Sequence, residues 1–154
     1  PYSFSKWQNS ELVKFYCELC DISYAITYFY NVYGGRENPD GEYATVVAKF
    51  LNRYRMNKKL HVTKPGTQTR NFTYIEDIIN ALKIIAEKGT GDEYGIANPN
   101  TYSIEEVAKL ISNDIEYVKE NPANRMSSQV ITKKTYDLGW KPRQELSDYI
   151  KNNL

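Results

Sequence analysis

Residues 23–35 read SYAITYFYNVYGG, and this stretch holds the pattern that decides the fold. Tyr24, Ile26 and Tyr28 alternate with smaller residues, which is the two-residue period of a β-strand. A pair of glycines closes the stretch, and glycine adopts turn conformations that other residues avoid. The stretch therefore predicts a strand followed by a sharp change in chain direction.

Helical patterns lie on both sides of this strand. From Ser5 to Leu19, apolar residues recur at the spacing of one helix face. Ser103 and Glu106 form the pattern of a capping box, and Thr132 is placed to cap a short helix that Gly139 ends. Further helices are predicted to carry Val47 to Tyr54, Glu76 to Lys88, Val107 to Ile111 and Leu146 to Ile150, and strands are predicted at LHVT, NFTY, DEYGIA and IEYV. This alternation predicts an α/β chain.

Charge and hydropathy exclude several classes of partner. Twenty basic residues against nineteen acidic ones give a net charge of +1, so no global field would attract nucleic acid or an anionic membrane. No apolar run approaches the ~20 residues of a membrane span. We therefore expect a soluble, cytoplasmic protein that binds neither nucleic acid nor membrane.

The two cysteines, Cys17 and Cys20, are spaced as C-x-x-C. This spacing occurs in redox pairs, but the motif lies inside a predicted amphipathic helix without a second cysteine pair. With His61 as the one histidine, ligands for a metal are lacking, so no metal site is predicted. Two half-buried helix thiols are the favoured interpretation.

Tyr2 and Lys6 are candidates for acid–base chemistry. Positions i and i+4 of an α-helix share a face, so the two side chains would lie together. An ammonium near a phenol favours the phenolate, which makes such a pair suited to moving a proton on or off a sugar hydroxyl. Tyrosine and lysine four residues apart also occur by chance, so the spacing alone leaves both interpretations open.

Four stretches together carry a more specific signal. In chain order, PYSFSK, YFYNVYGG, GTQTRNFTYIEDI and DLGWKP resemble the second half of the extended short-chain dehydrogenase/reductases, which include the NAD-dependent nucleotide-sugar epimerases and dehydratases. The resemblance implies that residues 1–154 are the C-terminal half of such an enzyme: the last part of a Rossmann-type parallel sheet plus the small substrate-binding region. The glycine-rich dinucleotide-binding half and the family's catalytic serine or threonine would be absent.

The resemblance also implies roles for individual residues. Tyr2 and Lys6 would be catalytic and would contact the nicotinamide ribose of NAD. The diphosphate and the nucleotide of the substrate would be held by Asn31, Thr45, Arg70 and Arg125. The cofactor would be NAD, which the 154 residues alone are not expected to retain.

Simpler interpretations stand beside these roles. Arg70 and Arg125 could be solvated surface charges, although guanidinium groups suit bidentate phosphate binding. Asn31 could be a turn former. Asp77 is interpreted as a charge that stabilises the N-terminal end of its helix. The hydrophobic core is predicted to include Trp7, Tyr16 and Trp140.

The sequence departs from the family pattern at two further positions. Tyr28 stands where the family usually has an arginine, so the local pairing is expected to differ. Asn71 stands where an aspartate usually follows the phosphate-binding arginine, and loss of that charge is expected to relax the loop that aims Arg70.

The function implied for the intact protein is the NAD-dependent epimerisation of a nucleotide sugar, as in a UDP-hexose 4-epimerase. A nucleotide-sugar 4,6-dehydratase and a non-catalytic nucleotide-sugar-binding fragment are the alternatives. A truncated sheet would expose apolar surface, so self-association, partial disorder near residues 1–10 or a companion chain is expected. In the intact protein, a homodimer contact through the helix from Ser5 to Leu19 is expected.

Overall fold

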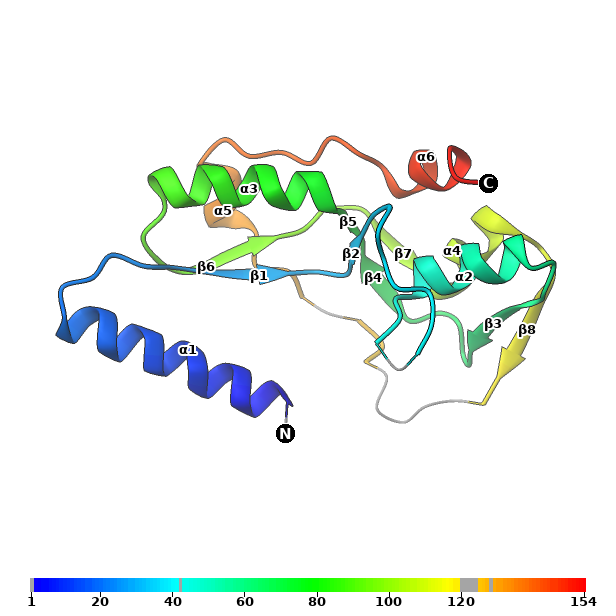
Figure 1. The fold of residues 1–154 in the computed structure, drawn as a ribbon, viewed down its shortest axis with the longest axis horizontal. Helices are drawn as coiled ribbons and strands as arrows, with labels where there is room; N and C mark the ends of the chain where they lie inside the picture. The colour runs from blue at the N-terminus through cyan, green and yellow to red at the C-terminus, as the bar shows by residue number, and fades with distance from the viewer. Residues whose placement is uncertain (1, 42, 120–124, 128) are drawn as a thin grey trace.

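The computed structural model describes residues 2–41, 43–119, 125–127 and 129–154 (Figure 1). Helices and strands alternate along the chain, as predicted. The elements are α1 (Tyr2–Leu19), β1 (Ala25–Phe29), β2 (Val32–Tyr33), α2 (Val46–Arg55), β3 (Leu60–Thr63), β4 (Thr69–Asn71), β5 (Thr73–Tyr74), α3 (Ile75–Lys88), β6 (Gly91–Ile96), β7 (Thr101–Ser103), α4 (Ile104–Ile111), β8 (Ile115–Val118), α5 (Lys133–Asp137) and α6 (Leu146–Lys151). Within these described ranges, no helix has the length and apolarity needed to cross a membrane.

Parallel pairing dominates the strands. β1 pairs with β6, β2 with β5 and β3 with β8, each in parallel, whereas β4 and β7 are antiparallel. Parallel neighbours require long connections between them, and helices supply these connections here. The mixed architecture confirms the predicted α/β class and the C-terminal part of a Rossmann-type arrangement.

Two predicted strands are divided by short breaks, one of two residues, Tyr30 and Asn31, and one of a single residue, Phe72. The strand in SYAITYFYNVYGG becomes β1 and β2, because Asn31 between them has a φ of 39°, in the left-handed region that interrupts a strand. The NFTY stretch belongs to β4 and β5, which are separated by the buried Phe72. These breaks change the direction of the chain between the two halves of the molecule (Figure 1).

The core consists of two hydrophobic clusters. One joins α2, α4 and α6 to β3 around fully buried Leu60 and Val62, and the other joins α3 to β6 around Ile78, Ile96 and Trp140. The prediction that Trp140 is a core residue is confirmed, since its side chain is 2% exposed.

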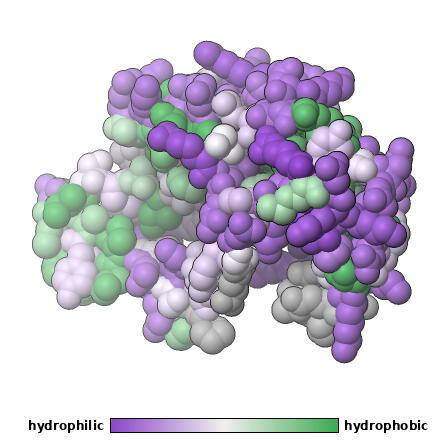
Figure 2. Space-filling view, turned by 45° about the vertical axis from the view of Figure 1, so that its right-hand side comes forward, coloured by the Kyte–Doolittle hydropathy of each residue, from purple (hydrophilic) through white to green (hydrophobic). Residues whose placement is uncertain are grey.

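Helix α1 differs from the prediction made for its side chains. The helix itself is confirmed (Figure 1), but none of its residues is buried. Trp7 and Tyr16 are 58% and 54% exposed, so the prediction that they belong to the core is wrong. The apolar pattern of α1 faces away from the described chain, and hydrophobic side chains gather on that side of the molecule in Figure 2.

Two helix caps were predicted with different success. The capping box is confirmed: the Ser103 hydroxyl accepts a hydrogen bond from the Glu106 amide at 3.1 Å, and the Glu106 carboxylate accepts one from the Ser103 amide at 2.6 Å. Thr132 occupies the N-cap position of α5, but its side chain makes no capping hydrogen bond. α5 instead depends on its contacts with β6 and on the Tyr136–Trp140 ring pair.

Asp77 does more than stabilise the start of a helix. It lies in the first turn of α3, as predicted, yet it is 3% exposed, and its Oδ2 accepts hydrogen bonds from the amides of Arg143 and Gln144, each at 3.0 Å. The indole of Trp140 donates to the carbonyl oxygen of Asp77 at 2.9 Å. These bonds join α3 to the segment that leads into α6.

Replacing Asp77 with asparagine separates this role from a helix-dipole effect. Asparagine keeps an oxygen that can accept both amide bonds but loses the charge, and hydrogen bonds to charged groups contribute about 1.5–3 kcal/mol against about 0.5–1.5 kcal/mol for neutral ones. The two weakened bonds would together cost about 1–3 kcal/mol. We expect Asp77→Asn to lower the free energy of unfolding by about that amount in denaturant titrations. Glu76→Gln removes an exposed charge from the same first turn and should change stability by less than about 1 kcal/mol. Equal effects of the two substitutions would contradict the bridging role.

Candidate functional site

Tyr2 and Lys6 lie together at the start of α1. The Lys6 ammonium nitrogen is 5.8 Å from the centre of the Tyr2 ring, one helical turn away. Tyr2 is 73% exposed, and Lys6 is exposed as well. The structure therefore places the phenol and the amine on a shared, open surface, which is the geometry expected from their spacing.

Asn31 lies at the break that follows β1. Its side-chain amide donates to the carbonyl oxygen of Asn71 at 3.0 Å, so it links the end of β1 to β4. Its left-handed backbone matches the interpretation as a turn former. That role leaves the side-chain oxygen of Asn31 available at an exposed position.

Asn71 anchors β4 instead of loosening it. The side chain is 3% exposed, and its amide nitrogen donates to the carbonyl oxygen of Asn98 at 2.9 Å, with Pro99 and Asn100 carbonyls at 3.3 and 3.4 Å. An ionised carboxylate has no proton to donate to these oxygens. The expectation that asparagine relaxes the segment that aims Arg70 is therefore wrong for this chain.

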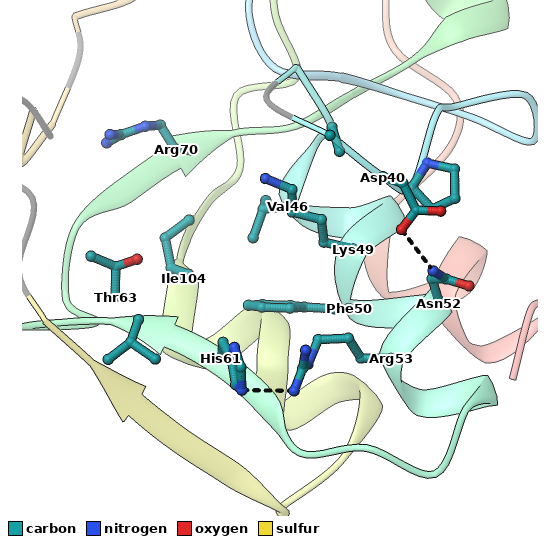
Figure 3. Close-up of a pocket in the computed structure, with 14 residues that line it drawn as sticks. Asp40, Val46, Lys49, Phe50, Asn52, Arg53, His61, Thr63, Arg70 and Ile104 are labelled. Carbon is teal, nitrogen blue, oxygen red and sulfur yellow. Dashed lines mark hydrogen bonds between the residues drawn. The ribbon is translucent and has the colours of Figure 1, made fainter.

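A pocket of about 530 Å³ opens beside Arg70 (Figure 3). Phe50, 2% exposed, supplies an apolar wall, with Arg70 on one side of it and the Arg53–His61 pair on the other in this view. Lys49 adds a third cation to the lining, and Asp40 is its carboxylate. A cavity with basic groups around an aromatic wall suits a ligand that combines anionic groups with a flat apolar part.

Several hydrogen bonds fix the basic side chains of the pocket. An Nη1 proton of Arg70 is donated to the carbonyl oxygen of Thr69 at 2.7 Å. Nη2 of Arg53 lies 2.7 Å from Nε2 of His61, a contact in which the guanidinium donates and the imidazole nitrogen accepts. Among the described residues, the bond to Thr69 uses one of the guanidinium protons of Arg70, and the other protons can be donated to an anionic ligand.

The remaining predicted residues lie at or beyond the rim. Thr45 is the N-cap of α2: its hydroxyl oxygen accepts from the Ala48 amide at 3.4 Å, and it donates to Glu37. Its neighbours Ala44 and Val46 line the pocket, whereas Thr45 does not. Arg125 is exposed, and the next residue, Met126, accepts a hydrogen bond through its carbonyl oxygen from the Thr69 amide at 2.8 Å. The backbone segments that carry Arg70 and Arg125 are therefore adjacent.

The predicted residues do not form one cluster. Tyr2, Lys6 and Asn31 are not among the residues that line the pocket. The structure thus separates a phenol–amine pair on α1 from a pocket with a basic lining between α2, β3 and β4. A substrate that uses both would have to extend from one to the other.

Comparisons with known proteins identify the family. Residues 1–98 match the model of the NAD dependent epimerase/dehydratase family. The chain belongs to this family. A candidate UDP-glucose 4-epimerase of Methanocaldococcus jannaschii is 32% identical over 98% of this chain and 51% of that protein, and the human dTDP-D-glucose 4,6-dehydratase is 29% identical over all of this chain and 47% of that protein.

Solved structures of this family share the fold. The UDP-glucose 4-epimerase of Thermotoga maritima, solved with UDP-glucose, superimposes with a TM-score of 0.91 at 26% identity, over 98% of this chain and 51% of that one. The UDP-glucuronic acid 4-epimerase of Bacillus cereus, solved with its UDP-sugar and NAD, gives a TM-score of 0.85 at 25% identity, over 98% of this chain and 50% of that one. The chain spans about half the length of the curated relatives it matches.

Sequence reasoning missed three basic residues that line the pocket: Lys49, Arg53 and His61. A signal for the first two was present, because basic residues four apart on α2 must share one face of the helix. His61 could not be placed this way, since alternation along β3 tells which residues share a face but not what that face meets.

Restoring an aspartate at position 71 tests how β4 is held. In Asn71→Asp the carboxylate would face three carbonyl oxygens without a proton, so we expect a loss of about 1–3 kcal/mol in the free energy of unfolding at pH 7. The carbonyl oxygens favour the protonated carboxyl group, which donates again, so the loss should shrink as the pH falls from 7 toward ~4. Asn113→Asp, at an exposed position, should cost less than about 0.5 kcal/mol. A wild-type stability of Asn71→Asp at pH 7 would contradict this account.

Proposed function

We propose that this chain is the substrate-binding and proton-transferring half of an NAD-dependent nucleotide-sugar epimerase that acts on a UDP-hexose. The observation that carries the proposal is the pocket with Arg70, Lys49 and the aromatic wall of Phe50, in a chain whose relatives include UDP-sugar epimerases. Guanidinium and ammonium groups offer donors and charge to a diphosphate, and an aromatic wall packs against a base or ribose. Arg125, on the segment beside β4, would supply a second guanidinium.

In this proposal Tyr2 is the acid–base group. Its phenolate would take the proton of a sugar hydroxyl, and the neighbouring Lys6 would favour the ionised form. With the diphosphate held by Arg70 and Arg125, the hexose could turn over without leaving the site, and Tyr2 would return the proton. Asn31, beyond the end of β1, would hold the diphosphate from the opposite side, and Thr45 would lie by the nucleotide.

The Tyr2 and Lys6 side chains would contact one part of NAD, a ribose. Tyr2 and Lys6 are exposed and offer a hydroxyl and an ammonium one turn apart, which suits the hydroxyls of a ribose. Bound NAD would supply the hydride acceptor for the sugar carbon. No G-x-x-G-x-x-G phosphate loop occurs in the 154 residues, so the other half of the dinucleotide would be held by a further segment.

The same residues would serve a 4,6-dehydratase. The human dehydratase matches the whole of this chain, almost as closely as the epimerase candidate does. Both reactions begin with removal of a proton and a hydride from the sugar, so Tyr2, Lys6 and the pocket have the same tasks in each. We further propose a cytoplasmic homodimer for the intact protein, with the exposed apolar residues of α1 at the contact.

Nucleotide binding by the chain tests the pocket directly. We expect UDP to bind in calorimetry and Arg70→Ala to weaken binding about tenfold or more, because a charge-assisted hydrogen bond contributes about 1.5–3 kcal/mol. Arg143→Ala, an exposed arginine outside the pocket, should leave the affinity unchanged. Binding that is absent, or that survives Arg70→Ala intact, would exclude this pocket as the nucleotide site.

Turnover tests the role of Tyr2. The 154 residues alone should neither retain NAD nor convert a UDP-hexose. When they are joined to the dinucleotide-binding half of an epimerase relative, we expect conversion to appear and Tyr2→Phe to reduce it by about 10²–10⁴-fold. Tyr16→Phe, on the same helix, is the control and should keep full activity. NAD reduction by the isolated chain would refute the division of labour proposed here.

A further inference from the structure

The face of α1 that meets the rest of the chain is polar. Along α1, Ser10, Lys14 and Cys17 are partly buried, and the other residues are exposed. Their spacing of four and three residues places them on one side of the helix. The helix therefore contacts the chain through a hydroxyl, an amine and a thiol, whereas its large apolar side chains point elsewhere.

Lys14 forms the central contact of this face. Its ammonium nitrogen lies 2.6 Å from Oδ2 of Asp92 on β6 and 2.9 Å from Oε1 of Glu11 on α1. The other oxygen of Asp92 accepts a hydrogen bond from the Tyr28 hydroxyl on β1 at 2.8 Å. The Lys14 and Asp92 side chains are 28% and 21% exposed, so water is partly excluded from the pair.

The contacts of Tyr28 show how the local pairing is made with a tyrosine where the family pattern has an arginine. The phenol hydroxyl supplies a donor to Asp92, and the positive charge comes from Lys14 on another element. Asp92 is held further by the Glu93 amide at 2.5 Å and, through its carbonyl oxygen, by Lys134 of α5 at 2.9 Å. The Asp92 carboxylate is therefore bound by residues of α1, β1 and its own strand, β6.

The surroundings of Lys14 and Asp92 favour the charged form of each side chain. Burial alone would raise the pKa of Asp92, but hydrogen bonds from Lys14, the Glu93 amide and Tyr28 hold the pKa below its usual range. Hydrogen bonds to Asp92 and Glu11 raise the pKa of Lys14. The lowered carboxyl pKa stabilises the pair above pH ~4, and the raised amine pKa stabilises it below pH ~10.5. The pair is therefore fully charged across the neutral range.

Because α1 is long, a small tilt at the contact between Lys14 and Asp92 moves Tyr2, at the other end of the helix, by several ångströms. Lys14 lies twelve residues from Tyr2, about 18 Å along a helix. A tilt of about 10° at Lys14 would displace Tyr2 by roughly 3 Å at that length. A displacement of about 1 Å of a reacting group can already cost about 100-fold in rate.

We propose that Lys14, Asp92 and Tyr28 are positioning residues that set the direction of α1 and thereby place Tyr2 and Lys6 against the substrate. They do not touch substrate or cofactor in this scheme. The consequence for catalysis rests on the proposed function of Tyr2 and Lys6, whereas the placement of α1 does not depend on it.

Spin-label distances test the placement in the chain itself. With Cys17 and Cys20 replaced by serine, labels are attached at Ser3→Cys on α1 and Lys83→Cys on α3, both exposed positions. We expect one narrow distance distribution from double electron–electron resonance, broadened by Lys14→Met and by Asp92→Asn. Lys14→Arg keeps the charge and should restore the narrow distribution. The control Lys133→Met breaks an ion pair confined to α5 and should change nothing.

The distances measured in the Lys14 variants decide whether Lys14 sets the direction of α1. Unchanged distances in Lys14→Met, or an equal broadening in Lys14→Arg, would overturn the proposal. None of the substituted residues is buried, and in a Trp7→Phe background unchanged fluorescence of the buried Trp140 would show that the core has folded. In the joined enzyme, Lys14→Met should lower kcat at least tenfold with KM unchanged, because the Arg70 pocket is untouched, and Lys14→Arg should restore kcat. An enzyme without turnover in any form would refute the proposed function alone, since the distances are measured independently.

Discussion

The parallel pairing of β1 with β6 is the constraint on which the rest of the molecule depends. Parallel strands end at the same edge of a sheet, and the register joins Phe29 to Ile96. Asn31 and Asn98, each two residues further on, therefore meet at one edge, where Asn71 connects them through hydrogen bonds at 3.0 and 2.9 Å. Ligands of α/β proteins bind beyond the carboxyl ends of strands. The pairing thus fixes both where β4 ends and where a substrate could lie.

Local patterns predicted the elements well because their causes are local. The capping box at Ser103 and the strand IEYV involve neighbouring residues, and both are confirmed. The burial of α1 could not be predicted in the same way. Periodic apolar residues show that a helix has an apolar face, but not whether the chain provides a surface to cover it. Trp7 and Trp140 look alike in sequence, but Trp140 is buried and donates to the carbonyl oxygen of Asp77, whereas Trp7 is exposed and lies by Phe4 of its own helix.

The candidate site was predicted in part for the same reason. The motif resemblance pointed to Arg70, and the structure places that arginine in the lining of a pocket. The pocket itself arises from segments far apart in the chain, α2, β3 and β4, so its other cations could not be assembled from spacing alone. Asp77 is a second example. Its position in the first turn of α3 could be predicted from the sequence, but its two amide partners could not, because they lie 66 and 67 residues away.

The two faces of α1 contribute differently to its placement. Covering a large apolar side chain yields about 1.5–3 kcal/mol, and the exposed set on α1 includes Phe4, Trp7, Leu12 and Phe15. An exposed ion pair contributes about 0–1 kcal/mol, so the contact between Lys14 and Asp92 cannot match a partner that covers the apolar face. Apolar contact has little directional preference, however, and a helix can rotate or slide along such a surface at small cost. A carboxylate that accepts bonds from Lys14 and Tyr28 at defined angles has one favourable arrangement. In the proposed homodimer the apolar face would therefore supply most of the free energy that holds α1, while the polar face would determine the rotation at which Tyr2 and Lys6 are presented.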